Sequence, residues 1–226
     1  MTPKVAFVLT VYNKEAWIAQ TLNSILDQTM KDIEIIVWDD GSTDNSTKIV
    51  EHYAKQDRRI IIGGTKVNQG IAKAYNCAQR LITAPYTCIA SADDLYDRLR
   101  AQRTWDYFEK HQEKYILYGN FWRVEADGTT IIEHKICPPY NKEALFEPNN
   151  QYIPHGFMSV QTKIFPEVPY DEKLKYGIDY PWIKALANKY PEFRFKHIKA
   201  DFGFYRWFQT NVSHQHRAEI VAQGNA

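Results

Sequence analysis

The stretch Ile33-Glu34-Ile35-Ile36-Val37-Trp38-Asp39-Asp40-Gly41-Ser42-Thr43-Asp44 joins an apolar run to two carboxylates and a polar turn. The apolar run predicts a buried strand, and the Gly, Ser and Asp residues that follow it predict a turn. Two adjacent carboxylates at the end of a buried strand lower the stability of the fold. In open α/β sheets, however, ligands bind outside the carboxyl ends of the strands. The stretch therefore predicts an α/β fold with a binding site at one edge of its sheet.

Apolar strand patterns and helical stripes alternate along the first 110 residues. Strands are expected over residues 4–10, 33–37, 59–62 and 86–90, and helices over 15–28, 44–54 and 71–81, with Asp44 as a helix cap. This alternation predicts a doubly wound, Rossmann-like, mostly parallel sheet flanked by helices. A second acidic pair, Asp93-Asp94, follows the last of these strands and predicts a second acidic position at the same edge.

The second half of the chain has a less regular pattern. Strands are expected over residues 114–124, 129–134, 159–164 and 194–204, a helix over 180–190, and little regular structure between Pro138 and Pro154. No linker-like segment interrupts the chain. We therefore expect a single domain over 1–217, with a nucleotide-binding half (1–110), a smaller, irregular acceptor-side half (111–217) and a polar tail (218–226).

Composition excludes several classes of protein. The 28 basic and 27 acidic residues give a net charge of +1, which argues against a nucleic-acid partner. Three widely spaced cysteines form no CxxC pair, which favours reduced thiols in the cytoplasm over a zinc site or disulfide framework. No apolar stretch approaches a membrane span. The expected location is cytoplasmic; peripheral association at the inner face of the membrane and homo-oligomerisation both stay open.

Four motifs in a fixed order carry a resemblance. They are Thr10-Val11-Tyr12-Asn13-Lys14 after the first strand, the Asp39–Asp44 stretch, Asn68-Gln69-Gly70 before the third helix, and Asp93-Asp94. Together they resemble family 2 of the inverting glycosyltransferases. The resemblance implies a GT-A fold, a nucleotide-diphosphate-sugar donor (UDP-linked), a divalent cation (Mn²⁺ or Mg²⁺), and a hydroxyl group of a glycan or lipid-linked acceptor.

The donor site is expected on the first two strands. Thr10 and Tyr12 leave the first strand on the same side and could surround a nucleotide base. Tyr12 can stack on that base, and Asp40 can accept hydrogen bonds from the base. By resemblance, Thr10, Tyr12 and Asp40 match residues that hold uridine, and Asn13 belongs to the same motif. Lys73, in the third helix, can neutralise a donor phosphate. Core packing, a turn carboxylate and a solvated lysine are the ordinary alternatives.

The metal site is expected at Ser91-Ala92-Asp93-Asp94. The family usually has D-x-D-D here, so Ser91 stands in for the first Asp. The resemblance assigns Asp93 as the metal ligand and Asp94 as a supporting group. The alternative is that both carboxylates merely cap the next helix.

The general base is expected at Asp179. Inverting transfer needs a base that deprotonates the acceptor hydroxyl, and the segment Tyr170–Asp179 resembles the family pattern that carries it, with Ile178 in place of a Glu. A helix N-cap is the alternative role. His155 is expected to contact acceptor or donor sugar, or to be structural.

The segment Tyr205–Ser213 resembles one that closes over the diphosphate and supplies a His to the metal. Phe208 occupies the position of that His. Arg206 remains as a phosphate contact, and His214 or His216 could supply the missing metal ligand instead. Two other functions stay open. A nucleotidyltransferase would carry a Gly-rich basic loop after the first strand, which is missing here. A non-catalytic sugar-nucleotide or glycan-binding domain is compatible with the altered Ser91, Ile178 and Phe208.

Overall fold

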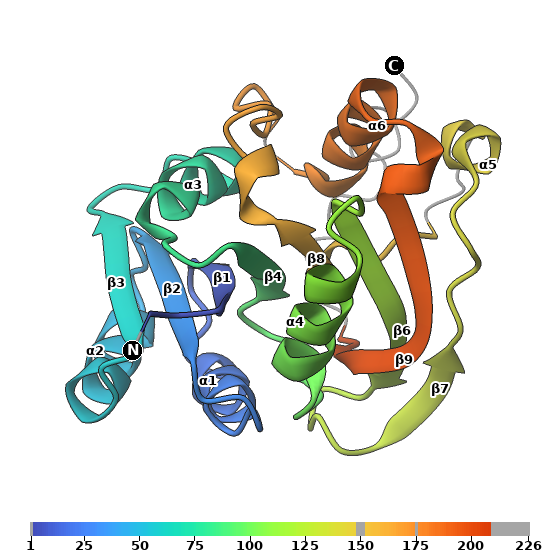
Figure 1. Ribbon diagram of the computed structural model, residues 1–226. Helices are drawn as coiled ribbons and strands as arrows, with labels where there is room; N and C mark the ends of the chain where they lie inside the picture. Colours follow the sequence, from blue (N-terminus) through green and yellow to red (C-terminus); the bar gives the residue numbers. More distant parts are fainter. Residues whose placement is uncertain (1, 148–151, 175, 209–226) are drawn as a thin grey trace.

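The computed structural model describes residues 2–147, 152–174 and 176–208, and within them a nine-stranded sheet lies between helices (Figure 1). The strands are β1 (Val5–Val11), β2 (Ile33–Asp40), β3 (Ile60–Thr65), β4 (Tyr86–Ser91), β5 (Leu95–Tyr96), β6 (Ile116–Val124), β7 (Ile131–Lys135), β8 (Met158–Gln161) and β9 (Phe195–Arg206). Their order is β3-β2-β1-β4-β8-β6-β9-β5, and β7 pairs with β6 off this path. Both halves of the sequence therefore contribute to one continuous sheet.

Helices cover both faces of this sheet. The α-helices are α1 (Ile18–Leu26), α2 (Ser46–Gln56), α3 (Ile71–Ala78), α4 (Arg100–Lys110), α5 (Lys142–Phe146) and α6 (Asp179–Lys189). The short 3₁₀ turns are η1 (Gln79–Leu81), η2 (His155–Phe157), η3 (Thr162–Ile164) and η4 (Glu192–Arg194). No helix in the described part of the chain has the length and apolar character needed to cross a membrane.

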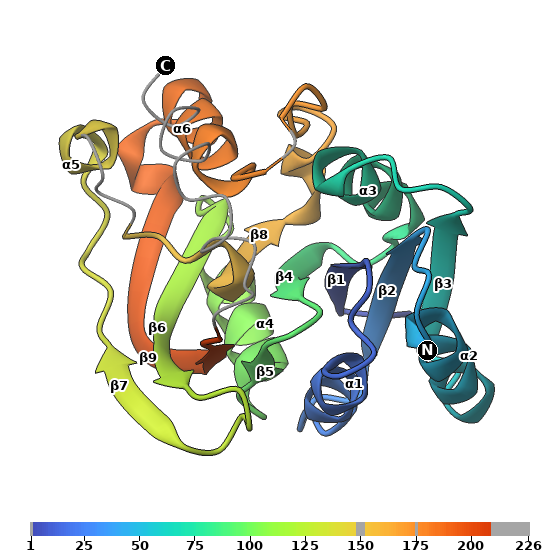
Figure 2. The ribbon, with the colours of Figure 1, turned by 180° about the vertical axis from the view of Figure 1, so that it is seen from behind.

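The four N-terminal strands β1 to β4 pair in parallel, with β1 between β2 and β4. Successive side chains of a strand point to opposite faces. Phe7 and Leu9 accordingly join the apolar cluster with α1, α2 and α4, whereas Val8 joins the cluster with α3 and α6. Seen from behind, α1 and α2 again lie on the side of the sheet away from α3 (Figure 2). Burial on both faces explains why these strands are continuous apolar runs.

The remaining strands make the sheet mixed. β8 runs antiparallel to both β4 and β6, and β9 runs parallel to β6. The two-residue strand β5 pairs antiparallel with β9. β5 was not expected, because two residues are too few to carry a periodic pattern.

The expected elements of the first half are present with two corrections. α1 begins at Ile18 rather than residue 15, because the Lys14 carbonyl accepts hydrogen bonds from Trp17 N (2.9 Å) and Ile18 N (2.9 Å) in a tight turn. The N-cap of α2 is Asn45, not Asp44. The Asp44 carboxylate instead accepts a hydrogen bond from Ser46 N (2.8 Å), just inside the helix.

Two corrections apply to the second half. The stretch expected to be irregular contains α5, which Asn141 caps by accepting a hydrogen bond from Ala144 N (2.8 Å) and which buried Leu145 anchors. The strand expected over 159–164 ends at Gln161, because Thr162 turns away and its hydroxyl donates to the Ala84 carbonyl (2.7 Å). The tail 218–226, His214 and His216 lie outside the described residues.

A fully buried arginine, Arg100 of α4, ties the parallel strands to the mixed part of the sheet. Its guanidinium donates to the carbonyl oxygens of Ile89 (2.8 Å), Met158 (2.8 Å) and Gly156 (3.0 Å). Four aromatic rings, including Tyr96 with its centroid 4.8 Å away, surround the group. Carbonyl oxygens and ring faces thus compensate for the desolvated charge.

We predict that Arg100→Met lowers the free energy of unfolding by roughly 3 kcal/mol or more, because three buried carbonyls lose a charged donor. Urea denaturation measures this change. Arg103→Met, one turn along the same helix, is the matched control. Arg103 binds the Asp97 carboxylate and the Asp201 carbonyl at the partly exposed surface, so its loss should cost only about 1 kcal/mol. Equal effects of the two substitutions would contradict the structural role of Arg100.

Candidate active site

The loops that follow β1 and β2 are joined by hydrogen bonds at the carboxyl edge of the sheet. The Asn13 side-chain oxygen accepts from Thr43 N (2.8 Å), and Asn13 N donates to the Ser42 hydroxyl (3.0 Å). Asn13 has a φ of 51°, a left-handed conformation that Asn tolerates better than most residues. The polar turn after Asp40 therefore fixes the shape of the loop after β1.

Asp40 holds a third loop at this edge. The buried carboxylate accepts hydrogen bonds from Gln69 N (3.0 Å) and Gly70 N (2.9 Å), at the start of α3. Next to it, Gly41 has a φ of 77°, and a Cβ there would lie 2.8 Å from the Asn68 backbone nitrogen. The Asp40-Gly41 and Asn68-Gln69-Gly70 motifs are thus structurally coupled. A contact between Asp40 and a nucleotide base stays a prediction.

The other predicted donor residues surround this edge. Thr10 lies in register between Trp38 of β2 and Ser91 of β4. Tyr12, just beyond the end of β1, is 44% exposed, so its ring is accessible for stacking. Lys73 is half-buried in α3. The structure brings Thr10, Asp40 and Ser91 to the ends of adjacent strands, as the sequence predicted.

The acidic pair after β4 has two unlike members. The Asp93 side chain is 16% exposed, and its Oδ2 lies 2.6 Å from Lys14 Nζ. Asp94 is 2% exposed, and its Oδ1 accepts a hydrogen bond from Arg206 N (2.9 Å). Burial is the largest cause that raises the pKa of Asp94 to about 8, and repulsion from Asp93 adds to it. Hydrogen bonds from Arg206 and Ser91 act in the opposite direction and lower this pKa. Asp93 is thus the more exposed member of the pair and the one available to a ligand from solvent.

Arg206, the last residue of β9, binds the backbone of this acidic pair. Its buried guanidinium donates to the Asp93 carbonyl (2.8 Å) and to the Gln20 side chain, and it lies 4.9 Å from the centroid of the Trp17 ring. These contacts hold the backbone of the acidic pair. The predicted phosphate contact of Arg206 is not visible in this arrangement and stays a prediction.

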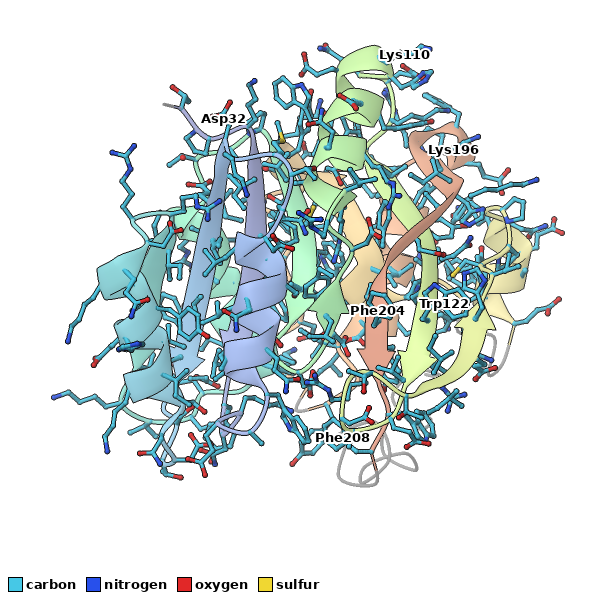
Figure 3. The ribbon with its side chains drawn as sticks, turned by 90° about the horizontal axis from the view of Figure 1, so that it is seen from below. Asp32, Lys110, Trp122, Lys196, Phe204 and Phe208 are labelled. Carbon is cyan, nitrogen blue, oxygen red and sulfur yellow. The ribbon has the colours of Figure 1, made fainter. Side chains whose placement is uncertain are left out.

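Phe208 occupies the sequence position at which the family resemblance implies a metal-binding His. Its ring stacks on Trp17 (5.0 Å between centroids) and has Lys14 Nζ 5.9 Å from its centroid. It follows the carboxyl end of β9, at the lower edge of the view in Figure 3. Because Lys14 binds Asp93, Phe208 is near the acidic pair, and a phenyl ring offers no ligand atom to a cation.

The predicted base, Asp179, is the first residue of α6, and its side chain is 54% exposed. Its Oδ1 lies 4.0 Å from Nδ1 of His155, which is 8% exposed. The residue after His155, Gly156, is so close to the acidic site that a Cβ there would lie 2.9 Å from the Ser91 hydroxyl and 3.4 Å from Asp94 Oδ2. His155-Gly156 therefore connects the acidic pair to Asp179.

The residues present fit a divalent cation. Carboxylate oxygens are the ligands that Mg²⁺ and Mn²⁺ prefer, and Mg²⁺ is commonly held by one or two carboxylates together with substrate phosphates. Asp93 offers one such group, and its pairing with Lys14 shows that its surroundings accept a positive charge. Within residues 2–147, 152–174 and 176–208, no group of three or more His, Cys, Asp or Glu converges. Donor phosphates would have to complete the ligand set.

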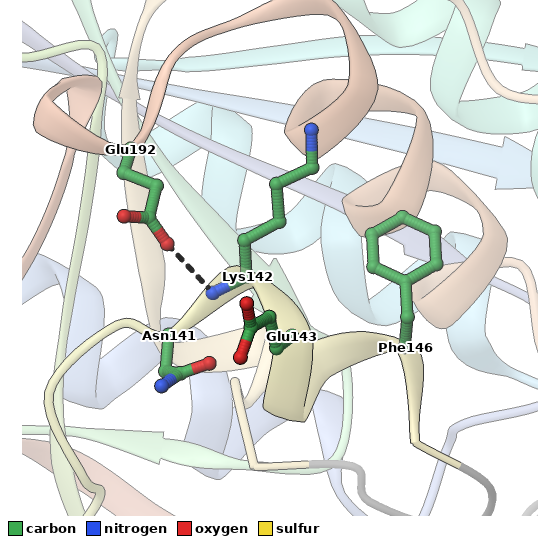
Figure 4. Close-up of a pocket in the computed structure, with 5 residues that line it drawn as sticks. All are labelled: Asn141, Lys142, Glu143, Phe146 and Glu192. Atoms are coloured by element: carbon green, nitrogen blue, oxygen red, sulfur yellow. Dashed lines mark hydrogen bonds between the residues drawn. The ribbon is translucent and has the colours of Figure 1, made fainter.

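A separate pocket of about 530 Å³ lies away from these residues. Asn141, Lys142, Glu143, Phe146 and Glu192 line it, and Glu192 accepts a hydrogen bond from Lys142 N at 2.9 Å (Figure 4). A second pocket, of about 550 Å³, is lined by residues of α3, η1 and the segment after β8. Neither contains a predicted site residue.

Sequence reasoning missed three residues that shape the site. Lys14 was visible in the first motif, but its partner Asp93 lies 79 residues further on. Tyr170 belongs to the segment that resembles the base motif, yet no local pattern reveals its contact with His155. Arg100 resembles any helix-start arginine, and only the fold shows its burial.

The sheet flanked by helices, with an acidic pair at the carboxyl end of β4, is the GT-A arrangement of glycosyltransferases that use nucleotide sugars. Residues 6–168 match the description "Glycosyl transferase family 2". The chain belongs to this family, which argues against the nucleotidyltransferase alternative.

Relatives and solved structures agree with this assignment. An uncharacterized glycosyltransferase of Methanocaldococcus jannaschii is 30% identical over 192 residues, which are 83% of this chain and 66% of the relative. Escherichia coli chondroitin synthase is 29% identical over 198 residues, 87% of this chain and 28% of that protein. The chain thus spans 66% of the first relative's length and 28% of the second's.

Two solved structures share the fold. S. aureus TarS in complex with UDP has a TM-score of 0.73 at 16% identity, with 98% of this chain and 70% of that chain covered. A mannosyltransferase from Pyrobaculum calidifontis in complex with GDP-Man and Mn²⁺ has a TM-score of 0.67 at 15% identity, with 98% of this chain and 61% of that chain covered. At these identities the likeness establishes the fold.

We predict that the contribution of Asp94 to the free energy of unfolding falls as the pH rises from about 4 to 8 with EDTA present. The folded pKa of Asp94, about 8, exceeds its ordinary value of 3.8, so its contribution is complete below pH 3.8 and is lost as the pH passes 8. Asp94→Asn should flatten this dependence, and exposed Asp106→Asn should not. Unchanged dependence in Asp94→Asn, measured by urea denaturation across this range, would contradict the burial argument.

Proposed function

We propose that the protein is an inverting, metal-assisted glycosyltransferase that moves a sugar from a UDP-linked donor to a hydroxyl group of a glycan or lipid-linked acceptor. One observation carries this proposal. An acidic pair, with Asp93 partly exposed, lies at the carboxyl edge of the sheet, and the exposed Asp179 carboxylate is connected to it through His155-Gly156. Donor and acceptor can therefore meet between two carboxylates in different environments.

The nucleotide would bind over β1 and β2. Tyr12 offers an accessible ring for the base, and Asp40 fixes the loop before α3 that faces it. TarS was solved with UDP and with UDP-GlcNAc, which supports a uridine donor. Lys73 remains the proposed phosphate contact from α3.

The departing diphosphate must be stabilised near Asp93. Asp93 would hold the divalent cation, which supplies positive charge to the leaving group when bound. The mannosyltransferase solved with GDP-Man and Mn²⁺ supports this role. Lys14 Nζ, now 2.6 Å from Asp93, would be freed to neutralise a phosphate oxygen. Arg206 would keep the Asp93 backbone in position through its bond to the carbonyl.

Asp179 would act as the general base. Its carboxylate accepts the proton of the acceptor hydroxyl while the acceptor oxygen bonds to the anomeric carbon. The bond from that carbon to the diphosphate breaks, and its electron pair leaves with the phosphate oxygen. Attack from the face opposite the leaving group inverts the configuration in one displacement.

A non-catalytic sugar-nucleotide or glycan-binding domain is the second candidate. The Ser91 hydroxyl and the Phe208 ring favour it, because Ser91 replaces the first Asp of the family motif and Phe208 replaces a His that can bind the metal. This candidate requires donor binding without turnover, whereas a transferase releases UDP in the presence of acceptor.

We predict that Asp179→Asn lowers transfer from a radiolabelled UDP-sugar panel by roughly 100-fold or more, since a general base contributes about 10²–10⁴-fold. Donor affinity should stay within about twofold, because only the proton acceptor is lost. Asp171→Asn, an exposed aspartate of the same segment, is the matched control and should transfer normally. Near-normal transfer by Asp179→Asn would contradict the proposed mechanism.

We predict further that Asp93→Asn reduces activation of transfer by Mn²⁺ about 10-fold or more, because the charged ligand is lost. A Mn²⁺ titration of the transfer rate measures this effect. Asp97→Asn, four residues further along the chain, controls for local changes. The same half-maximal Mn²⁺ concentration in Asp93→Asn and wild type would remove Asp93 from the metal site.

A further inference from the structure

His155 is held in a box of aromatic rings beside the proposed base. Its ring meets Tyr75, Tyr170 and Trp182 edge-on, at 5.5, 5.6 and 5.8 Å between centroids and interplanar angles of 82–90°. Edge-to-face contacts on several sides fix the plane of the imidazole. One ring nitrogen, Nε2, lies 2.6 Å from the Tyr170 hydroxyl, and the other, Nδ1, lies 4.0 Å from Asp179 Oδ1.

The direction of the first of these hydrogen bonds follows from burial. The Tyr170 hydroxyl is fully buried, which raises its pKa well above the ordinary value, so it keeps its proton. Within the described part of the chain, His155 Nε2 is the acceptor at hydrogen-bond distance from this hydroxyl. The neighbouring donors are directed elsewhere: Trp182 Nε1 donates to the Val168 carbonyl (2.7 Å), and the Tyr75 hydroxyl donates to the Ala90 carbonyl (2.8 Å).

An imidazole that accepts at Nε2 and is neutral carries its proton on Nδ1. Burial lowers the pKa of His155, which favours the neutral ring, although the Asp179 charge acts in the opposite direction. The other titratable or charged groups near the ring are Arg100, which binds the Gly156 carbonyl, and Asp94, on the far side of Gly156, whose pKa burial raises. Tyr170 therefore selects the tautomer whose N–H points toward Asp179.

We propose that His155 is a positioning residue for Asp179: its Nδ1–H, set by the Tyr170 hydroxyl, orients the carboxylate that takes the acceptor proton. This inference rests on the proposed function and replaces the expected sugar contact of His155. The 4.0 Å separation is longer than a hydrogen bond, but Asp179 is exposed and free to turn, and such contacts commonly shorten when substrate binds. His155 does not take the proton; it fixes which carboxylate oxygen faces the acceptor.

The tautomer can be tested without any donor. In a proton–nitrogen correlation NMR spectrum of protein with isotope-labelled histidine, the His155 signals are identified by their absence in His155→Asn. We expect wild type to be protonated at Nδ1 and Tyr170→Phe to lose this preference. Tyr118→Phe is the matched control, because it removes a tyrosine hydroxyl that binds the Pro138 carbonyl (2.8 Å) and not His155. A wild-type ring protonated at Nε2 overturns the proposal.

Kinetics test the consequence. Tyr170→Phe and His155→Gln should lower kcat roughly 10- to 100-fold with donor KM unchanged, the range typical of groups that orient a reacting partner. His155→Asn should recover most of kcat, because its amide nitrogen occupies the place of Nδ1. Equal losses in His155→Asn and His155→Gln overturn the positioning role. If Asp179→Asn transfers normally while His155 is protonated at Nδ1, the proposed base is wrong but the Tyr170–His155 arrangement stands.

Discussion

The site depends on the burial of one carboxylate, Asp94, next to another. A buried carboxylate beside a like charge is unfavourable unless donors surround it. Here the backbone N–H of Arg206 and the Ser91 hydroxyl face Asp94, while Lys14 neutralises Asp93. The hydrogen bond from Arg206 N to the Asp94 carboxylate joins the ends of β4 and β9, which are more than a hundred residues apart in sequence. Pairing with β6 and β5 places β9 in the sheet, and the hydrogen bond from Arg206 N to Asp94 fixes its last residue beside the acidic pair.

This arrangement gives the two acidic residues separate roles. Asp94, whose pKa is raised by burial, accepts the Arg206 N–H and anchors the backbone, whereas the Asp93 side chain is more exposed. The close approach of Gly156 to Ser91 and Asp94 then sets how near His155 and Asp179 come to the pair. A Cβ at position 156 would lie 2.9 Å from the Ser91 hydroxyl, so either Ser91 or η2 would have to shift to accommodate it.

Much of the fold could be predicted from the sequence because β1 to β4 are continuous apolar runs separated by helical stripes. Elements that depend on tertiary contacts could not be predicted. β5 is too short for a pattern, and α5 depends on the Asn141 cap and on buried Leu145 in a proline-rich stretch. At the site, Asp40 and the Ser91–Asp94 stretch were expected at strand ends of one sheet, and the structure places them at the carboxyl ends of β2 and β4. The partners of Asp93 and His155 come from distant segments, Lys14 and Tyr170, and no local pattern encodes them.

In the proposed mechanism, the carboxyl edge binds a nucleoside diphosphate through a cation on Asp93. Calorimetric titration of wild-type protein with UDP, GDP, dTDP, CMP and ATP, each with Mn²⁺ and again with EDTA, tests it most directly. We expect UDP to bind with Mn²⁺ and to bind at least about 10-fold more weakly with EDTA. Binding of no nucleotide, or UDP binding that is indifferent to EDTA, would contradict it.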